Sequence, residues 1–302
     1  MKGISNILLG LAVLFFLASC NDTKKPADTL ATGTIDISVD ETYKPVIEEE
    51  LKVFDSSYPE AHINIHYKPE AECYKDLFDK KARLILVTRP LTQNEKDYCE
   101  QKQIVPTSEV LAEDAVTAIV NNASADSMMG VNEIKGILTG VYKKKYTVVF
   151  DNEGSSTVRY ITDSLLRGQP LAKNVYGAKG NQHVIDYVEK NPDAIGFLGL
   201  MHVNSSEDSS GGGSFIKNVK VVSIYNDSAK QYYQPYQAVI ALKLYPFTRK
   251  LYYIKSENYP GLGTGFANFL TRERGQLIFA HAHLFPLKMN IVIRSAEINT
   301  DH

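Results

Sequence analysis

The sequence predicts an α/β protein with mainly parallel strands and enough chain for two lobes. Short apolar runs, typical of strands, are separated by segments whose apolar residues recur at helical spacing. This alternation favours a sheet covered by helices over a sandwich or a helical bundle. The chain has 302 residues, more than one hydrophobic core usually holds. Its hydrophobic content of 44% and charged content of 23% are typical of globular proteins.

The first twenty residues have the pattern of a secretion signal. Lys2 precedes a short apolar run at residues 4–17, which is shorter than the roughly 20 residues that a spanning helix needs. The small residues just before Cys20 resemble the lipobox of bacterial lipoproteins, which implies cleavage before Cys20 and a lipid on it. An ordinary signal peptide with an incidental cysteine is the alternative. Residues 21–33 are polar and are expected to form a flexible tether.

These features predict a location in the cell envelope, in the periplasm or on the outer surface, with lipid as the membrane anchor. The net charge of -2 argues against general attraction to nucleic acid or anionic lipid. Cys73 and Cys99 remain in the mature chain, and a disulfide between them would stabilise the fold by about 3 kcal/mol. Whether they pair is left open. Two cysteines without clustered histidines make a zinc site unexpected.

The first half of the chain alternates between strand and helix patterns. Residues 35–39 alternate like a strand, and Pro45 suits the first turn of a helix over residues 46–57. The continuous apolar run LILV at residues 84–87 indicates a strand buried on both faces. The remaining elements are expected as strand 63–67, helix 72–81, helix 93–102 and strand 116–120.

A second unit is expected to begin near residue 121. Its helices are predicted at residues 131–139, 156–166 and 183–190, and its strands at 146–150, 194–200, 220–224 and 238–242. Residues 204–213 are polar and glycine-rich, as in a surface loop. The chain then continues with strand 250–254 and helices 265–271 and 274–282.

Several motifs carry a resemblance to a known family through their order. They are VDETYKP at 39–45, TRPLT at 88–92, EDA at 113–115, EGSST at 153–157, YPFTRKLY at 245–252, GQ at 275–276 and LFP at 284–286. From residue 33 to residue 294 this order resembles the substrate-binding proteins of phosphate-type ABC transporters. The chain is therefore identified as a member of the periplasmic-binding-protein-like superfamily, in lipoprotein form.

The resemblance implies a two-lobed clamshell with mixed, mainly parallel sheets and crossover strands at the hinge. Lobe 1 would comprise residues 34–115 and 246–302, and lobe 2 residues 116–245. It further implies a monomer that captures a small ligand, by resemblance phosphate or a related oxyanion, and delivers it to an ABC permease. No cofactor and no nucleic-acid partner are expected.

The clearest candidate for a ligand site is the helix start at Gly154-Ser155-Ser156-Thr157. A helix N-terminus offers unpaired N–H groups and a partial positive charge of about +0.5. Together with the hydroxyls of Ser155, Ser156 and Thr157 it could wrap an oxyanion. The alternative is that these side chains only cap their own helix.

Further candidates lie on neighbouring loops. Arg89 follows a buried strand, and its guanidinium fork suits an oxyanion, although a structural ion pair is the alternative. Glu41, Thr42 and Tyr43 lie in the first loop, where the hydroxyls of Thr42 and Tyr43 could donate hydrogen bonds; a simple turn is the alternative. Arg159, one turn into the helix after residue 156, could offset the negative charge nearby.

The chain departs from the family pattern in the charge of these loops. Asp151 stands where the family places an arginine, and PEAEC at residues 69–73 replaces a glycine-rich loop. Acidic residues therefore gather at the expected cleft: Asp40, Glu41, Glu70, Glu72, Asp151 and Glu153. Like charges 4 Å apart repel by roughly 4 kcal/mol at an effective dielectric of 20. A cationic or zwitterionic solute, or a metal ion, is consequently an alternative ligand, and a sensor or scaffold without transport is an alternative role.

An enzyme is not expected, and no catalytic residue is assigned. The pairs His62/His66 and His281/His283 have spacings that could ligate a metal, but scattered histidines are far commoner. No Ser-His-Asp or Cys-His arrangement is legible in the sequence.

Overall fold

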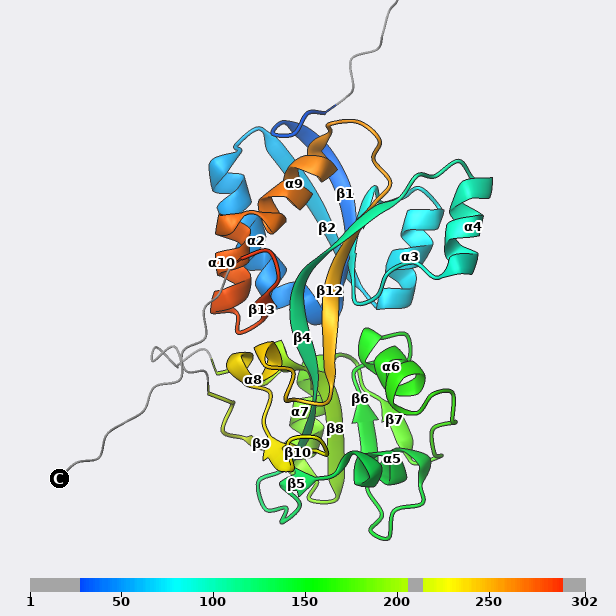
Figure 1. Ribbon diagram of the computed structural model, residues 1–302, viewed down its shortest axis with the longest axis vertical. Helices are drawn as coiled ribbons and strands as arrows, with labels where there is room; N and C mark the ends of the chain where they lie inside the picture. Colours follow the sequence, from blue (N-terminus) through cyan, green and yellow to red (C-terminus); the bar gives the residue numbers. More distant parts are fainter. Residues whose placement is uncertain (1–27, 206–213, 290–302) are drawn as a thin grey trace, which may run out of the picture.

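The computed structural model describes residues 28–205 and 214–289. They form two lobes joined by two long strands, β4 (Thr107–Asn121) and β12 (Thr248–Lys255), which run from one lobe into the other (Figure 1). The predicted signal peptide with Cys20, residues 21–27 of the predicted tether, and residues 206–213 of the predicted polar loop lie outside the described residues.

Lobe 1 is built on a parallel sheet. Its strands are β1 (Gly33–Asp40), β2 (Ala61–Lys68) and β3 (Leu84–Val87), with β1 between the other two. Its helices are α2 (Lys44–Ser57), α3 (Glu70–Phe78), α4 (Gln93–Gln101), α9 (Leu262–Thr271) and α10 (Glu273–His281). Leu84 and Leu86 pack in the core that holds α2 and α9, while Ile85 and Val87 pack in the core that holds α3. Both faces of β3 are covered, which explains its uninterrupted apolar sequence.

Lobe 2 has a second parallel set and its own core. Its main strands are β6 (Thr147–Phe150), β7 (Val175–Gly177) and β8 (Ala194–Gly199), with β6 between the other two. Around them lie α5 (Val131–Thr139), α6 (Ser156–Tyr160), the π-helical turn η2 (Ile161–Leu165), α7 (Asn181–Lys190), the 3-10 turn η3 (Leu200–His202) and α8 (Gln237–Ala241). A small sheet contains β5 (Met128–Met129), β10 (Ser223–Asn226) and β11 (Gln231–Tyr233).

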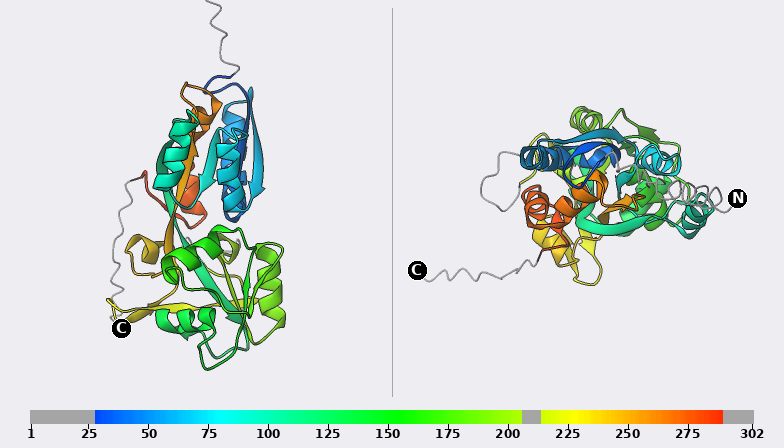
Figure 2. Two further views of the ribbon diagram at one scale, coloured as in Figure 1. Left: turned by 90° about the vertical axis from the view of Figure 1, so that its right-hand side faces the viewer. Right: turned by 90° about the horizontal axis from the view of Figure 1, so that it is seen from above.

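The hinge strands make one continuous sheet of the two lobes. The strand order is β2-β1-β3-β12-β4-β8-β6-β7, and β9 (Val219–Val221) and β13 (Phe285–Pro286) also pair with β4. β12 is antiparallel to β3 and β4, and β4 is antiparallel to β8. The sheet is therefore mixed, with more antiparallel pairing than local patterns indicate. Figure 2 shows the same two bodies from the side, with β4 and β12 between them.

Two expectations for single elements are wrong. Of residues 238–242, expected as a strand, the first four belong to helix α8 and Leu242 is its C-cap. A short apolar run has no periodicity that separates strand from helix. The strand expected at 220–224 is split at Val222 into β9 and β10, which join different sheets. The strand expected at 116–120 is the inner part of the 15-residue β4.

The last part of the predicted tether belongs to lobe 1. Asp28 is buried, and its carboxylate accepts hydrogen bonds from the Tyr259 hydroxyl at 2.8 Å and the Leu262 N–H at 3.2 Å. Arg83 forms an ion pair with the same carboxylate. The prediction of a flexible tether is therefore wrong at Asp28, which is held in lobe 1. Cys73 and Cys99 are both buried and free, so the structure has no disulfide between them.

Candidate functional site

Loops from both lobes meet where parallel strands end. β1 leads into the 3-10 turn η1 (Glu41–Tyr43), β2 into α3, β3 into Thr88, and β6 into α6. The carboxyl ends of strands are the edge at which α/β sheets bind ligands. The Ala71 N–H of lobe 1 donates to the Gly154 carbonyl of lobe 2 at 3.4 Å, and the Asn152 side chain donates to Glu41. These loops thus form a closed interface between the two lobes, which is called the cleft here.

A buried ion pair lies at the base of this cleft. Arg249 on β12 donates through Nε to Asp114 Oδ2 on β4 at 2.9 Å. Its Nη1 donates to the Ser156 hydroxyl of α6 at 2.9 Å, and the Tyr43 hydroxyl donates to Asp114 at 3.0 Å. Arg249 is only 5% exposed. This cluster connects both hinge strands to the first loop of lobe 1 and to α6 of lobe 2.

The two lobes approach closely beside this ion pair. The Thr42 and Ser156 hydroxyl oxygens are 3.4 Å apart, and Nε2 of His202 lies 3.0 Å from the Thr42 carbonyl oxygen. A Cβ added to Gly199, the last residue of β8, would lie 2.3 Å from Thr42 Cγ2. Only a glycine at position 199 permits this approach.

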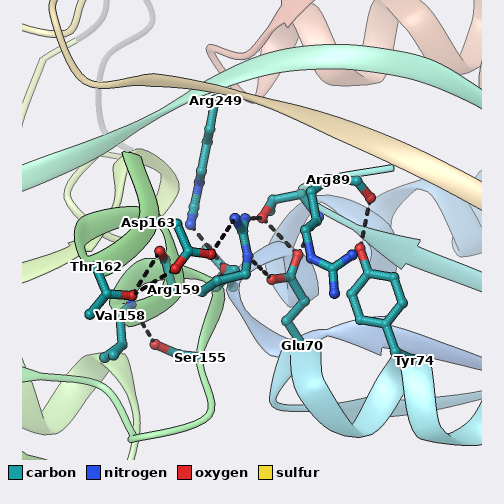
Figure 3. A network of polar contacts seen from close by, with 12 residues as sticks. Glu70, Tyr74, Arg89, Ser155, Val158, Arg159, Thr162, Asp163 and Arg249 are labelled. Carbon is teal, nitrogen blue, oxygen red and sulfur yellow. Dashed lines mark hydrogen bonds and ion pairs between the residues drawn. The ribbon is translucent and has the colours of Figure 1, made fainter. Parts of the chain in front are cut away.

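A second ion pair bridges the cleft further out, as Figure 3 shows. Glu70, the first residue of α3, accepts hydrogen bonds at Oε1 from the Thr88 N–H at 2.6 Å and the Thr88 hydroxyl at 2.7 Å. Its Oε2 accepts from Nε of Arg159 at 2.5 Å. Nη2 of Arg159 also donates to the Thr88 hydroxyl at 2.5 Å. Lobe 1 supplies Glu70 and Thr88, and lobe 2 supplies Arg159.

Arg89 is engaged in a separate contact at the edge of lobe 1. Its guanidinium makes a two-pronged ion pair with Glu95, at 2.7 and 2.8 Å, and lies 4.0 Å from the centre of the Tyr74 ring. The Tyr74 hydroxyl donates to the Arg89 carbonyl at 2.7 Å. In this arrangement Arg89 makes a structural ion pair, which is the alternative to the predicted ligand contact. No hydrogen bond joins it to α6.

The three hydroxyl residues of the predicted helix start have different roles. Ser155 caps α6 by accepting from the Val158 N–H at 3.2 Å, which is the capping alternative. Ser156 accepts from Arg249, as described above. Oγ1 of Thr157 is buried without a hydrogen-bond partner among the described residues. α6 has only five residues before it continues as a π-helical turn, so its N-terminus alone makes no anion site.

Buried polar atoms without a partner gather around these clusters. Within the described ranges they include Asp40 Oδ2, Asp114 Oδ1, Asp151 Oδ2, Thr157 Oγ1 and Arg249 Nη2. Burial, and then the negative charge of Glu70, raise the pKa of Asp40 to about 7, although Arg249 opposes the shift. Burial likewise raises the pKa of Asp151. The cleft therefore carries less negative charge than its count of carboxyl groups indicates.

The raised pKa of Asp40 predicts a specific dependence of stability on pH. Between about pH 4 and pH 7 the folded state holds a proton on Asp40 that the unfolded chain has lost, so a rise in pH favours unfolding. The non-titrating variant Asp40→Asn lacks this contribution. We expect the free energy of unfolding of the wild type, minus that of the variant, to fall across this window and to level off above it. Urea unfolding at a series of pH values measures this difference, and curves that run parallel would contradict the assignment.

Among the described residues no group of three or more His, Cys, Asp or Glu side chains could hold a metal ion. His66, one of the histidines with suggestive spacing, lies 2.9 Å from Asp36 on the neighbouring strand. None of the helices in the described ranges is long and apolar enough to cross a bilayer.

A family model described as a PBP superfamily domain matches residues 24–274, well over half of the chain. The chain belongs to the PBP superfamily. A comparison with curated protein sequences gives no match.

Solved structures share the two-lobed fold of this PBP-superfamily chain. A phosphate ABC transporter substrate-binding protein from Clostridium perfringens, solved with bound phosphate, has a TM-score of 0.70 at 20% identity and covers 85% of this chain and 100% of its own. An ABC-type phosphate transport receptor from Vibrio cholerae has a TM-score of 0.64 at 19% identity, covering 83% and 99%. The CcmR regulatory domain from Synechocystis PCC6803 in complex with 2-PG has a TM-score of 0.54 at 14% identity, covering 79% and 96%. The predicted two-lobed α/β fold is confirmed.

The sequence reasoning missed several residues that shape the cleft of this PBP-superfamily protein. Arg249 and Asp114 lie inside two of the motifs, but no local pattern marks them as partners, because they are 135 positions apart and meet only when their strands pair. Glu70 was noted only as part of an acidic loop. The signal that could have drawn attention to Gly199 is its place at the end of the apolar run AIGFLGL, where strand ends approach ligands and neighbouring loops.

Proposed function

We propose that this protein is the extracytoplasmic solute-binding component of an ABC importer and that it closes over phosphate or a related oxyanion. A lipid on Cys20 would anchor it to the membrane, and an ABC permease would receive the ligand. The protein would act as a monomer, with residues 28–115 and 246–302 forming lobe 1 and residues 116–245 forming lobe 2. We assign it no catalytic activity.

One observation carries the ligand class. The Thr88 N–H, the Thr88 hydroxyl and the Arg159 guanidinium all donate to one oxyanion between the lobes, the Glu70 carboxylate. The N–H and the guanidinium can only donate hydrogen bonds, and the hydroxyl can donate one. A guanidinium also pairs well with the oxygens of a planar carboxylate or a tetrahedral phosphate. The known structures with this fold that are named as phosphate-binding proteins support the same ligand class.

The remaining candidate residues receive supporting roles in this proposal. Thr42 and Ser156 bring hydroxyls from opposite lobes to the base of the cleft, and the Thr157 hydroxyl has no hydrogen-bond partner within the described part of the chain. Tyr43 and Ser155 orient these loops through Asp114 and through the helix cap. Glu41 closes one side of the cleft through Asn152, and Arg89 would reach the ligand only after leaving Glu95.

A thermal-shift panel tests the proposal. Phosphate, sulfate, divalent cations and amino acids would be added separately to the purified protein. An oxyanion at 100 times its dissociation constant should stabilise the fold by about 2.7 kcal/mol, seen as a rise in Tm. The variant Arg159→Met should lose this rise, since it removes the cationic donor. Arg167→Met removes an exposed charge from the same lobe and should keep it.

The outcomes separate the alternatives. A response to divalent cations or amino acids, with none to oxyanions, would favour a changed ligand. No response to any member of the panel would favour a sensor or scaffold. An oxyanion response that survives in Arg159→Met would remove Arg159 from the site.

A further inference from the structure

We propose that Glu70 is a built-in competitor of the ligand: its carboxylate fills the oxyanion position between Thr88 and Arg159 and must withdraw before an external anion can bind there. The inference rests on the proposed oxyanion-binding function and deepens it, because it makes Glu70 the residue that sets the affinity and selectivity of the cleft.

The first support is the donor set. Both oxygens of Glu70 are used, one by the two donors of Thr88 and the other by Arg159, and the residue is 1% exposed. The buried carboxylate accepts hydrogen bonds from an N–H, a hydroxyl and a guanidinium, and an external oxyanion would be bound by the same kinds of donor. Because a carboxylate has no proton to donate, these contacts make no distinction between Glu70 and any other deprotonated anion.

The second support is the place of Glu70 in the chain. It starts α3 directly after Pro69, on the loop that touches the opposite lobe through the Ala71 N–H and the Gly154 carbonyl at 3.4 Å. A Cβ on Gly154 would lie 3.3 Å from Pro69 Cβ, so the loops are already in close contact. An external anion cannot take these donors of Thr88 and Arg159 while they are bound to Glu70. Its side chain must rotate away, or the lobes must separate.

Electrostatics point in the same direction. The charge of Glu70 acts on the buried Asp40, whose pKa it helps to raise. If a monovalent external anion takes the place of the Glu70 carboxylate, the net charge beside Thr88 and Arg159 therefore stays the same. A divalent oxyanion gains more from Arg159 and Arg249, so we expect the cleft to discriminate in favour of phosphate and sulfate over monovalent anions such as nitrate or acetate.

A competitor of this kind lowers the observed affinity by the fraction of molecules in which the site is vacated. Neutralising it should remove that reduction. The variant Glu70→Gln keeps the size of the side chain and an acceptor oxygen for Thr88 but loses the negative charge. Its matched control is Glu72→Gln, which removes the same charge from an exposed position in the same helical turn.

Isothermal titration with inorganic phosphate tests the inference. We expect Glu70→Gln to bind phosphate at least tenfold more tightly than the wild type, and Glu72→Gln to stay within twofold of it. Glu70→Asp keeps the charge on a shorter side chain and should fall between the wild type and Glu70→Gln. Circular dichroism of each variant checks that the fold is retained.

The failures are distinguishable. Equal or weaker binding by a folded Glu70→Gln, with the wild type binding phosphate, would overturn the competitor role and leave the proposed function intact. Binding by Glu70→Gln alone would support the inference strongly. If neither binds any oxyanion, both the inference and the oxyanion assignment are wrong.

Discussion

Replacing Arg249 by alanine is expected to lower the free energy of unfolding by about 3–5 kcal/mol, because it leaves the carboxylate of Asp114 buried and unpaired. Asp114 is fully buried and receives its hydrogen bonds from Arg249 and the Tyr43 hydroxyl. The same change removes the donor to Ser156, which links the hinge to lobe 2. Urea unfolding followed by circular dichroism measures the loss.

Two further variants make the interpretation specific. Lys250→Ala changes the next, exposed residue of β12 and should alter stability by no more than about 0.5 kcal/mol. The double variant Arg249→Met with Asp114→Asn removes both charges and should recover part of the loss, since no charge is then left unpaired. A loss below about 1 kcal/mol for Arg249→Ala would show that this ion pair does not secure the hinge.

Gly199→Ala is expected to push the lobes apart. The added Cβ would overlap Thr42 Cγ2 at 2.3 Å and lie 3.0 Å from Nη2 of Arg249, so the contact between β8 and η1 must open. We expect a loss of about 1–3 kcal/mol in stability, as for other overpacked sites, together with weaker ligand binding. Small-angle scattering should show a larger radius of gyration than in the wild type.

Gly177→Ala is the matched control for that substitution. Its added Cβ would meet nothing closer than 3.8 Å, so neither the stability nor the radius of gyration should change. A Gly199→Ala protein with wild-type dimensions and wild-type binding would mean that the close approach of Thr42 is not needed for closure.

Local sequence patterns were sufficient for most of the secondary structure. The strand predicted from the run LILV at 84–87 has the same bounds as β3, because a strand covered on both faces needs only apolar residues. Helix α8 shows where local patterns are insufficient, because the apolar run at 238–242 fits a strand as well as a helix. In the structure this helix packs against β4 and β13. The full length of β4 could not be read either, because its outer half includes polar residues that pair with β12.

The candidate site was predicted less well, for a physical reason. The loops were located correctly in sequence, but the partner of each charge depends on distant contacts. Arg89 was a plausible ligand contact, although the sequence held a clue to its partner: Thr92 and Glu95 have the spacing of a capping box, which places Glu95 at the start of α4 beside Arg89. No comparable local signal joins Glu70 to Arg159, because the two lie in different lobes.

The most direct test is a crystal structure of the protein grown with inorganic phosphate. We expect a tetrahedral anion between Thr88 and Arg159, with the Glu70 carboxylate moved away from both residues. A structure in which Glu70 keeps its hydrogen bonds to the Thr88 N–H and to Nε of Arg159, with no phosphate in the cleft, would contradict it.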